Sequence, residues 1–460
     1  MARPPRRRKA NGNDDRTSSD DDSANTQDQS LHLLHTPTCS QTLLITRLVD
    51  TCERLTLEDT PFALVPCRIG FAPTIDNAAT AVVLARSNVH THRTTGMRHY
   101  SAALKHLKQV LHDPVQRFSD QALLSAFLLA LYENTTPQLT GKRHDADPSQ
   151  APHRNGVTAM LLARAAQQHC PDVGEVVRAV FYQAWQSIFL VPIRLGAPSP
   201  FDTPFFHSLD PPTHWKLPPD FVKLRKTSQQ LFVRLPELII SLRQFKVDKS
   251  SFGNVELCRL ARVAQELLHF RDDGAENSFL HELRIVKSSD QTCTFMPFMF
   301  AQTALVPRRA GHMYWTLRAL IARMYLSLVE LGVVPDDKET MQALWEEKLR
   351  MAANLIMCWQ GPDYESGGHL RSGRHGLAPS LTAAWAALMD LEDFRGVPIC
   401  DVKDWMLQRL AGPLQRNISS HMTAIEAAFD RSVRFMTGEP MTPGGSGTFN
   451  PFEASIHDVF

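Results

Sequence analysis

The sequence has 460 residues, which is long enough to form a large buried core. Of these residues, 43% are apolar and 21% are charged, values close to the average for soluble globular proteins. Its formal net charge is +1, so the composition gives no sign of a surface that binds a polyphosphate along its length. No apolar run approaches the roughly 18 residues of a membrane-spanning helix, and no signal peptide follows the basic N-terminus, so we expect a protein that is neither secreted nor embedded in a membrane.

The first 30 residues combine Pro, Arg, Asn, Ser and Asp with almost no large apolar side chains. Ordering such a segment would bury too little apolar surface to offset the lost entropy, so we expect a disordered tail over 1–30. Its basic run is typical of a nuclear localisation signal, with a solvated basic tail as the alternative: Arg6, Arg7, Arg8 and Lys9. The aspartates between 14 and 28 lack accompanying aromatic and leucine residues, and we interpret them as a solvated spacer.

The clearest pair of predicted helices comes next. Within 97–111, apolar residues recur at intervals of four and three and so share one helix face: Tyr100, Leu104, Leu107 and Leu111. Asp113-Pro114 ends this helix, because proline has no N–H and restricts the residue before it. Ser119 then stands at an N-cap position, and Asp120 suits the positive end of the dipole of the next helix. The spacing predicts two antiparallel helices joined by a short turn.

Similar periodicity extends along most of the chain. It predicts further helices at 76–90, 156–168, 173–190, 229–244, 253–270, 310–331, 338–358, 379–391 and 402–429. The proline-rich stretch 192–219 is expected to interrupt them, and the one candidate strand, 291–300, contains Pro297, which counts against it. We therefore predict an all-α fold in which antiparallel helix pairs form one large domain over 31–440, followed by a flexible C-terminal tail over 441–460.

Several motifs follow one another in a set order. The alanine-rich stretch DNAATAVVLA leads into YSAALKHLKQVLHDP and SDQALLSAFLLALYE, followed by HRNGVTAMLLAR, FYQAW and the distal WEEKLRMAANLIMCWQ and PSLTAAWAAL. This order resembles the helical regulatory domain of fungal zinc-cluster transcription factors over roughly 40–435, and most closely over 76–190. The positions that carry the resemblance are Tyr100, Ala103, Leu104, Leu107, Leu111, Asp113, Pro114, Asp120, Leu123, Leu128, Leu129, Tyr132, Glu133, His153, Gly156, Met160, Leu161, Arg164, Phe181, Tyr182 and Trp185.

Members of that family carry six cysteines near the N-terminus, which bind two zinc ions and place a basic helix in the major groove of DNA. This chain has no cysteine in residues 1–38, and its eight cysteines are scattered without a Cys-x-x-Cys pair, so the zinc cluster is absent. We expect most of the cysteines to be small buried apolar residues, and we expect no metal and no other cofactor. DNA would be reached only through a partner or through an N-terminal module missing from this chain.

The resemblance implies a regulator of transcription in the nucleus. Its helical domain would bind protein partners or co-regulators and form homo- or heterodimers. An alternative is a helical scaffold that holds protein partners outside transcription. We do not expect an enzyme, because the sequence contains no nucleophile elbow, no H-E-x-x-H and no phosphate-binding glycine motif.

Three local patterns invite a functional interpretation, and we favour a structural one for each. Histidines occur at 90, 92, 99, 106 and 112, but His99 and His106 lie two helical turns apart, about 10 Å, which is too far for one metal ion. The glycine-rich stretch 365–376 matches no phosphate-binding motif and is expected to be a surface loop. Asp272-Asp273-Gly274 lacks the remaining ligands of a calcium loop.

Overall fold

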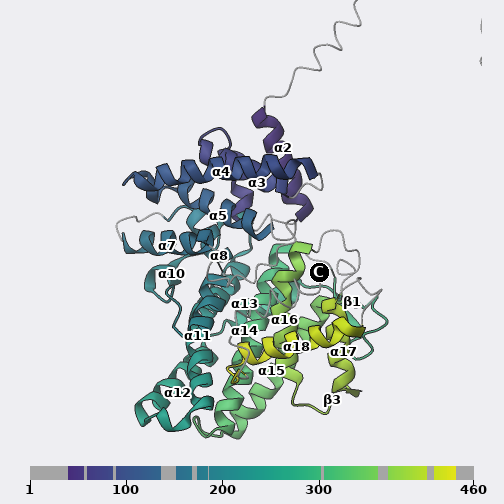
Figure 1. Ribbon diagram of the computed structural model, residues 1–460. Helices are drawn as coiled ribbons and strands as arrows, with labels where there is room; N and C mark the ends of the chain where they lie inside the picture. The colour runs from purple at the N-terminus through teal and green to yellow at the C-terminus, as the bar shows by residue number, and fades with distance from the viewer. Residues whose placement is uncertain are drawn as a thin grey trace, which may run out of the picture. The chain divides into compact units, whose positions relative to one another are not determined.

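The computed structural model describes residues 40–55, 60–85, 90–135, 152–167, 173–184, 186–301, 305–360, 371–411 and 419–441. Contacts between residues divide the chain into two units, Met1–Leu43 and Leu44–Phe460, and the elements below belong to the second, apart from the first turn of α2 (Ser40–Leu55). In the described residues the fold is all-α, as predicted, with two small sheets of two strands each (Figure 1). The expected tails, 1–30 and 441–460, lie outside the described residues except for Met441.

The described residues from 73 to 183 form five α-helices, and the first two of them pack closely through small residues. The five are α3 (Pro73–Ala85), α4 (His90–His112), α5 (Asp120–Thr135), α7 (Pro152–Ala166) and α8 (Glu175–Gln183). α3 lies against α4 and α5 (Figure 1), and most of its side chains are buried. A Cβ atom added at Gly96 of α4 would lie 3.5 Å from Leu84 Cβ and 3.7 Å from the carbonyl oxygen of Ala81. Small residues on both helices therefore let the two backbones approach closely.

The turn between α4 and α5 confirms the predicted helix end and helix start. Asp113 Oδ1 accepts hydrogen bonds from the backbone N–H of Val115 at 2.8 Å and of Gln116 at 3.2 Å. These bonds hold the pKa of Asp113 below its ordinary value, because they stabilise the carboxylate. Ser119 Oγ accepts from the backbone N–H of Ala122 at 3.2 Å, which is the N-cap bond of α5.

The single helix predicted over 173–190 is wrong, because the chain turns within it. α8 ends at Gln183, a π-helical turn follows at Gln186–Leu190, and α9 (Val191–Leu195) comes next. Pro192 accounts for the new start, since a residue without an N–H is best placed in the first turn of a helix. The proline-rich stretch beyond contains only α10 (Pro204–Ser208) and a 3-10 turn at Thr213–Trp215. None of the described helices is alone long and apolar enough to span a membrane; the bent pair Glu175–Gln183 and Ser187–Leu195 meets that test only jointly.

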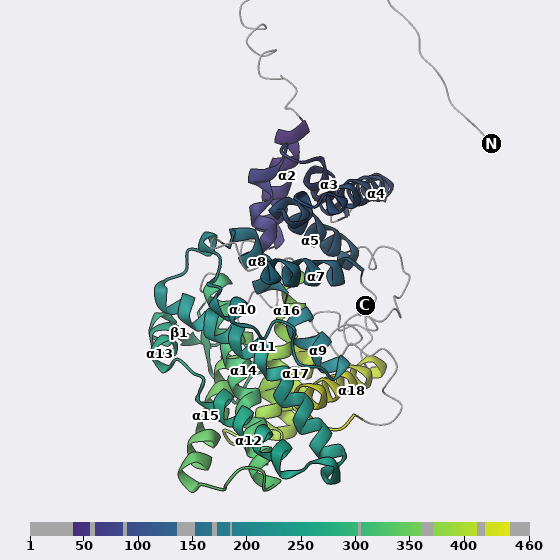
Figure 2. The same ribbon diagram turned by 90° about the vertical axis from the view of Figure 1, so that its left-hand side faces the viewer.

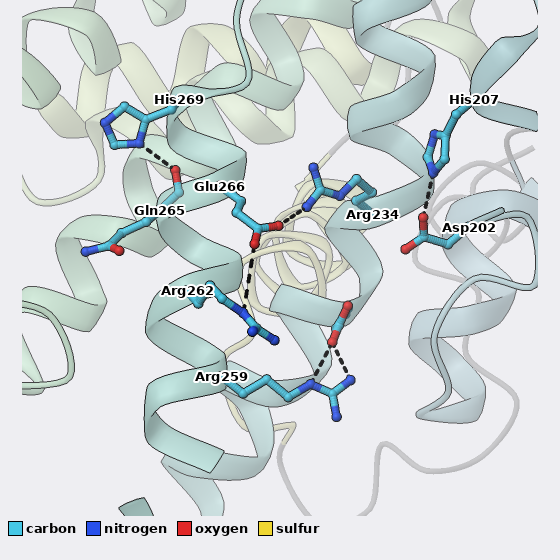
Figure 3. A network of polar contacts seen from close by, with 9 residues as sticks. Asp202, His207, Arg234, Arg259, Arg262, Gln265, Glu266 and His269 are labelled. Carbon is cyan, nitrogen blue, oxygen red and sulfur yellow. Dashed lines mark hydrogen bonds and ion pairs between the residues drawn. The ribbon is translucent and has the colours of Figure 1, made fainter. Parts of the chain in front are cut away.

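α11 (Pro219–Val247) and α12 (Asn254–His269) form an antiparallel pair with ion pairs along its solvent side. Arg234 pairs with Glu266, while Arg259 Nε lies 3.0 Å from Glu237 Oε1, so the contacts run in opposite order along the two helices (Figure 3). Exposed pairs of this kind contribute about 0–1 kcal/mol each. The buried apolar side chains of both helices therefore supply most of the stability of this pair.

α13 (Asp273–Glu282) is a helix that the periodicity did not predict. Its N-cap is Asp272, whose Oδ1 accepts from the backbone N–H of Ala275 at 2.9 Å, so the Asp-Asp-Gly pattern starts a helix. Further along, β1 (Ile285–Lys287) pairs antiparallel with β2 (Phe298–Phe300). The candidate strand 291–300 thus narrows to the three residues after Pro297, because proline cannot donate to the ladder.

α14 (Leu305–Glu330) is enclosed by other helices. It contacts α11, α12, α15 (Lys338–Trp359) and α16 (Arg371–Leu388). Between 314 and 328 every side chain except that of Arg323 is buried. A helix that is buried all round must find a protein partner for each of its charged side chains, because water does not reach them.

The C-terminal part contains two helices where one is predicted over 402–429. They are α17 (Ile399–Ala411) and α18 (Ser419–Met436), which lie against each other (Figure 2), and the hairpin of β3 (Asp393–Phe394) and β4 (Val397–Pro398) precedes them. The prediction is wrong because the sequence between the two helices begins with Gly412 and Pro413, a pair that does not continue a helix.

The close contact at Gly311 of α14 gives a stability prediction. A Cβ atom at this position would lie 2.3 Å from Cε1 and 2.5 Å from Cζ of the buried Phe279 ring. Gly311→Ala should therefore lower the free energy of unfolding by about 1–3 kcal/mol, despite the better helix propensity of alanine. The matched control is Gly156→Ala in α7, where nothing lies within 4 Å of the added Cβ, so stability should rise by about 0.5–1 kcal/mol. Chemical denaturation measures both, and equal effects of the two substitutions would contradict the overpacking.

Candidate functional site

The proposed localisation signal, Arg6, Arg7, Arg8 and Lys9, lies outside the described residues, as do the aspartates at 14–28 and Trp185. The glycine-rich stretch 365–376 is described only from Arg371 onward, as backbone at the start of α16. The other candidates can be located. They belong to a polar cluster that joins α4, α5 and α7, to the outward face of α4, and to isolated positions elsewhere.

Three residues that carry the family resemblance meet in one polar cluster. The hydroxyl of Tyr100 in α4 donates to Glu133 Oε1 of α5 at 2.9 Å, and His153 Nε2 of α7 lies 3.1 Å from the same hydroxyl. His153 Nε2 and Glu133 Oε1 are 3.4 Å apart, and the Tyr100 ring stacks on Tyr132 with 4.7 Å between centroids. Burial, followed by the Glu133 carboxylate, raises the pKa of Tyr100, so the hydroxyl stays protonated and remains a donor. The cluster therefore links three helices and supplies no phenolate nucleophile near neutral pH.

A second pair of motif residues lies at the start of α5. Arg164 of α7 has its NH1 atom 2.8 Å from Asp120 Oδ1 and also donates to the carbonyl oxygen of Phe118. The carboxylate of Asp120 thus interacts favourably with the positive end of the dipole of α5, and it also binds Arg164 of α7. A Cβ atom at Gly174 would lie 3.0 Å from Asp120 Oδ2, so the residue before α8 also packs against this ion pair.

His99 and His112 of α4 have separate partners. His99 Nδ1 lies 2.9 Å from Asn77 Oδ1 of α3, and His112 Nδ1 lies 2.6 Å from the carbonyl oxygen of Lys108. In the part of the chain that the structure describes, no group of three or more His, Cys, Asp or Glu side chains could hold a metal ion. The expectation that most cysteines are buried is wrong for three of the five whose side chains are described, since these are exposed: Cys67, Cys258 and Cys400.

The outward face of α4 is basic. Arg98, Lys105 and His112 are exposed at intervals of seven residues, and Lys108 is exposed beside them. The sequence of α4 contains no aspartate or glutamate, and no carboxylate of the described residues forms an ion pair with these lysines and this arginine. Leu111, predicted to share the buried face, is exposed instead, because it lies in the last turn of the helix, where few residues cover α4.

A small apolar cavity lies between the turn at Gln186–Leu190 and the helices α11, α14, α16 and α18. It measures about 20 Å³ and is lined by Phe189, Phe232, Thr316, Leu317, Leu320, Pro379 and Met436. A space of this size holds about one water molecule, whereas ligand pockets measure roughly 300–1,000 Å³. We interpret this cavity as a packing defect.

A network of buried charges around α14 was not predicted. Arg318 is 0% exposed, and its Nε lies 2.7 Å from Glu347 Oε1 of α15. Its NH1 donates to the carbonyl oxygens of Leu267 at 3.2 Å and Leu268 at 2.9 Å, in the last turn of α12. Those carbonyls have no partner within their own helix, so Arg318 satisfies them from inside the core. The sequence signal was an arginine inside the apolar run LRALIA, where a surface residue is not expected.

Glu276 of α13 belongs to the same network. Its Oε1 accepts from Trp315 Nε1 at 3.1 Å and from Arg350 NH1 at 2.6 Å. Burial raises the pKa of Glu276 more than Arg350 and Trp315 lower it, because the carboxylate loses its contact with water. Together with the Arg318–Glu347 pair, these contacts run in opposite order along α14 and α15, so the two helices are antiparallel.

Lys348 of α15 is also 0% exposed, but its partners are weaker. Its Nζ lies 3.7 Å from Asp390 Oδ2, beyond normal hydrogen-bond distance, and 3.6 Å from the centroid of the Trp345 ring. Asp390 Oδ2 already pairs with Arg323 NH1 at 2.6 Å. Desolvation lowers the pKa of Lys348 to about 8, because burial penalises the ammonium more than Asp390 stabilises it.

Lys348→Met should raise the free energy of unfolding by about 1–3 kcal/mol near pH 7, because it replaces a poorly paired buried ammonium with an apolar side chain of similar volume. The gain should shrink as the pH rises from about 8 toward 10.5. In that window the folded wild type alone releases the Lys348 proton, so the unfolded state binds more protons and the wild type becomes more stable. Denaturation curves of both proteins at several pH values measure the difference, and a gain that grows with pH would contradict the assignment.

Arg318→Met is the contrasting variant for this prediction. It leaves Glu347 and the two carbonyl groups of α12 without their buried donor. The free energy of unfolding should fall by about 3–5 kcal/mol, the opposite sign to Lys348→Met.

The polar cluster gives a prediction for a double-mutant cycle. Tyr100→Phe removes the hydroxyl that Glu133 accepts from and should lower the free energy of unfolding by about 1–2 kcal/mol. In the background of Glu133→Gln, Tyr100→Phe should lower the free energy of unfolding by a smaller amount, because the charged hydrogen bond is already lost. The coupling energy between the two substitutions should be about 1 kcal/mol. Additive effects in chemical denaturation would show that the two groups do not interact.

Comparisons with known proteins do not place the chain in a family, since no family model, curated protein or solved structure matches it.

Proposed function

We propose that this chain is a regulator of transcription in the nucleus, whose helical domain binds other proteins and which acts on DNA through a partner. The observation that carries the proposal is the ordered set of motifs over 76–190. Its support from the structure is that motif residues far apart in the sequence contact each other. Tyr100 meets Glu133 and His153, and Asp120 meets Arg164.

The contacts favour a binding role over a catalytic one. The titratable groups of the polar cluster and of the α14 network are engaged with neighbouring helices, so they stabilise the domain. The exposed charge of α4 offers partners a surface that needs no enclosed pocket. We therefore propose no catalytic step, no metal and no cofactor for this chain.

The localisation part of the proposal depends on Arg6–Lys9. A tagged full-length protein should accumulate in the nucleus, and replacing Arg6, Arg7, Arg8 and Lys9 with alanine should leave it in the cytoplasm, because the receptor groove binds exposed positive charge. Appending the same four residues to the C-terminus of this variant is the matched control and should restore import. Fluorescence microscopy measures the location of all three proteins. If the alanine variant still accumulates in the nucleus, these four residues are not the localisation signal.

The regulatory part of the proposal depends on transcripts. Deleting the gene should change the abundance of a defined set of transcripts, and restoring the wild-type chain should reverse the change. An unchanged transcript profile, with a tagged protein that stays in the cytoplasm and captures cytoplasmic proteins, would favour the helical scaffold outside transcription.

A further inference from the structure

The outward face of α4 carries positive charge. Arg98, Lys105 and Lys108 lie opposite the buried residues Ala103 and Leu107, on the side of the helix that faces solvent. No acidic residue interrupts the helix over its 23 residues. The field above the segment from Arg98 to Lys108 therefore attracts negative charge.

An apolar stripe borders these charges. Met97, Leu104 and Leu111 follow one another at intervals of seven, so they form one line along the helix. Met97 is 55% exposed and Leu111 is 41% exposed, while Leu104 is partly buried against the core. From Met97 to Leu111 the line covers about 21 Å, at 1.5 Å per residue.

A heptad line of apolar side chains beside a row of cations is the pattern of one half of a helix–helix interface. We propose that the outward face of α4 binds an amphipathic helix of a partner protein, with apolar residues at heptad spacing and carboxylates at the flanking positions. The partner's apolar residues pack on Met97, Leu104 and Leu111. Its carboxylates lie beside Arg98, Lys105 and Lys108. This inference rests on the proposed function and names the kind of partner that the regulatory domain recruits.

Other occupants fit this face less well. A DNA duplex carries about one charge per 1.7 Å, so three cations over about 21 Å neutralise a small share of it, and phosphates leave the apolar line uncovered. A second copy of α4 would set positive charge against positive charge. The chain's own aspartates at 14–28 are acidic, but that stretch has no leucine or aromatic residue to cover the apolar line.

The test measures binding of a designed probe to the full chain. The probe is a fluorescent helical peptide of about 21 residues, with leucine at both core positions of each heptad and glutamate at the flanking positions. A peptide of the same composition in shuffled order is the control probe. Fluorescence anisotropy measures both, and binding of the ordered peptide should weaken as salt rises, because exposed charges are screened.

Two triple variants test the position of the site. Arg98→Glu, Lys105→Glu and Lys108→Glu together should weaken binding of the ordered peptide by at least about tenfold. The matched control is Arg284→Glu, Lys287→Glu and Arg434→Glu, which changes the net charge equally at exposed positions outside α4 and should have less than about a twofold effect. A peptide with lysine in place of glutamate should bind the α4 triple variant, which also shows that this variant is folded.

The apolar line has its own variant. Met97→Ser with Leu111→Ser should weaken binding of the ordered peptide by at least about fivefold and leave its salt dependence unchanged. Equal binding of the ordered and shuffled peptides, equal weakening by the two triple variants, or tighter α4-dependent binding of a DNA duplex or an anionic vesicle would each overturn the docking surface.

Transcript measurements separate this inference from the proposed function. If deletion of the gene changes transcripts and the α4 triple variant restores them fully, the docking surface is overturned while the regulatory function stands. If deletion changes no transcript, the regulatory function is overturned, and peptide binding at α4 decides the docking surface by itself.

Discussion

A single guanidinium that has lost all contact with water constrains the centre of this fold. Arg318 lies in α14 and contacts the carbonyl groups that end α12 and a carboxylate of α15. A buried charge is tolerated only where its partners are fixed, so the end of α12 and the register of α15 are both set by this one side chain. Glu276 extends the same constraint to α13, because it accepts from Trp315 and Arg350 on the two neighbouring helices.

The N-terminal helices follow another rule. There α4 approaches α3 closely at Gly96, and polar contacts join α4, α5 and α7. Tyr100 and Asp120 each contact a residue more than 30 positions away, on a helix that the chain reaches only after a turn. Some motif residues that are dispersed in sequence therefore contact each other in the fold.

Periodicity predicted what depends on local sequence. The end of α4 at Asp113, the N-cap at Ser119 and the all-α class follow from neighbouring residues, and the structure confirms them. The start of α9 and the start of α13 depend on short signals, namely Pro192 and the cap Asp272, which a count of apolar spacings overlooks. The buried charges were not predicted from the sequence for another reason. A helix enclosed on all sides has no polar face, so spacing alone cannot tell that Arg318 points inward.

The exposed basic face of α4 depends on both local sequence and tertiary structure. The spacing of Arg98 and Lys105 predicts that they share one face, but only the folded chain shows that no carboxylate of the described residues forms an ion pair with them. The exposure of Leu111 depends on where the covering helices end, and this is a property of the tertiary structure rather than of α4.

The contact between Gly311 and the Phe279 ring makes the history of these two positions dependent on each other. While phenylalanine occupies 279, any larger residue at 311 meets the ring, so glycine is the favoured residue there even though alanine suits a helix better. Once 279 carries a smaller side chain, the restriction disappears and alanine becomes acceptable at 311. A lineage can therefore exchange both residues in one order without passing through an overpacked intermediate, and in the other order it cannot.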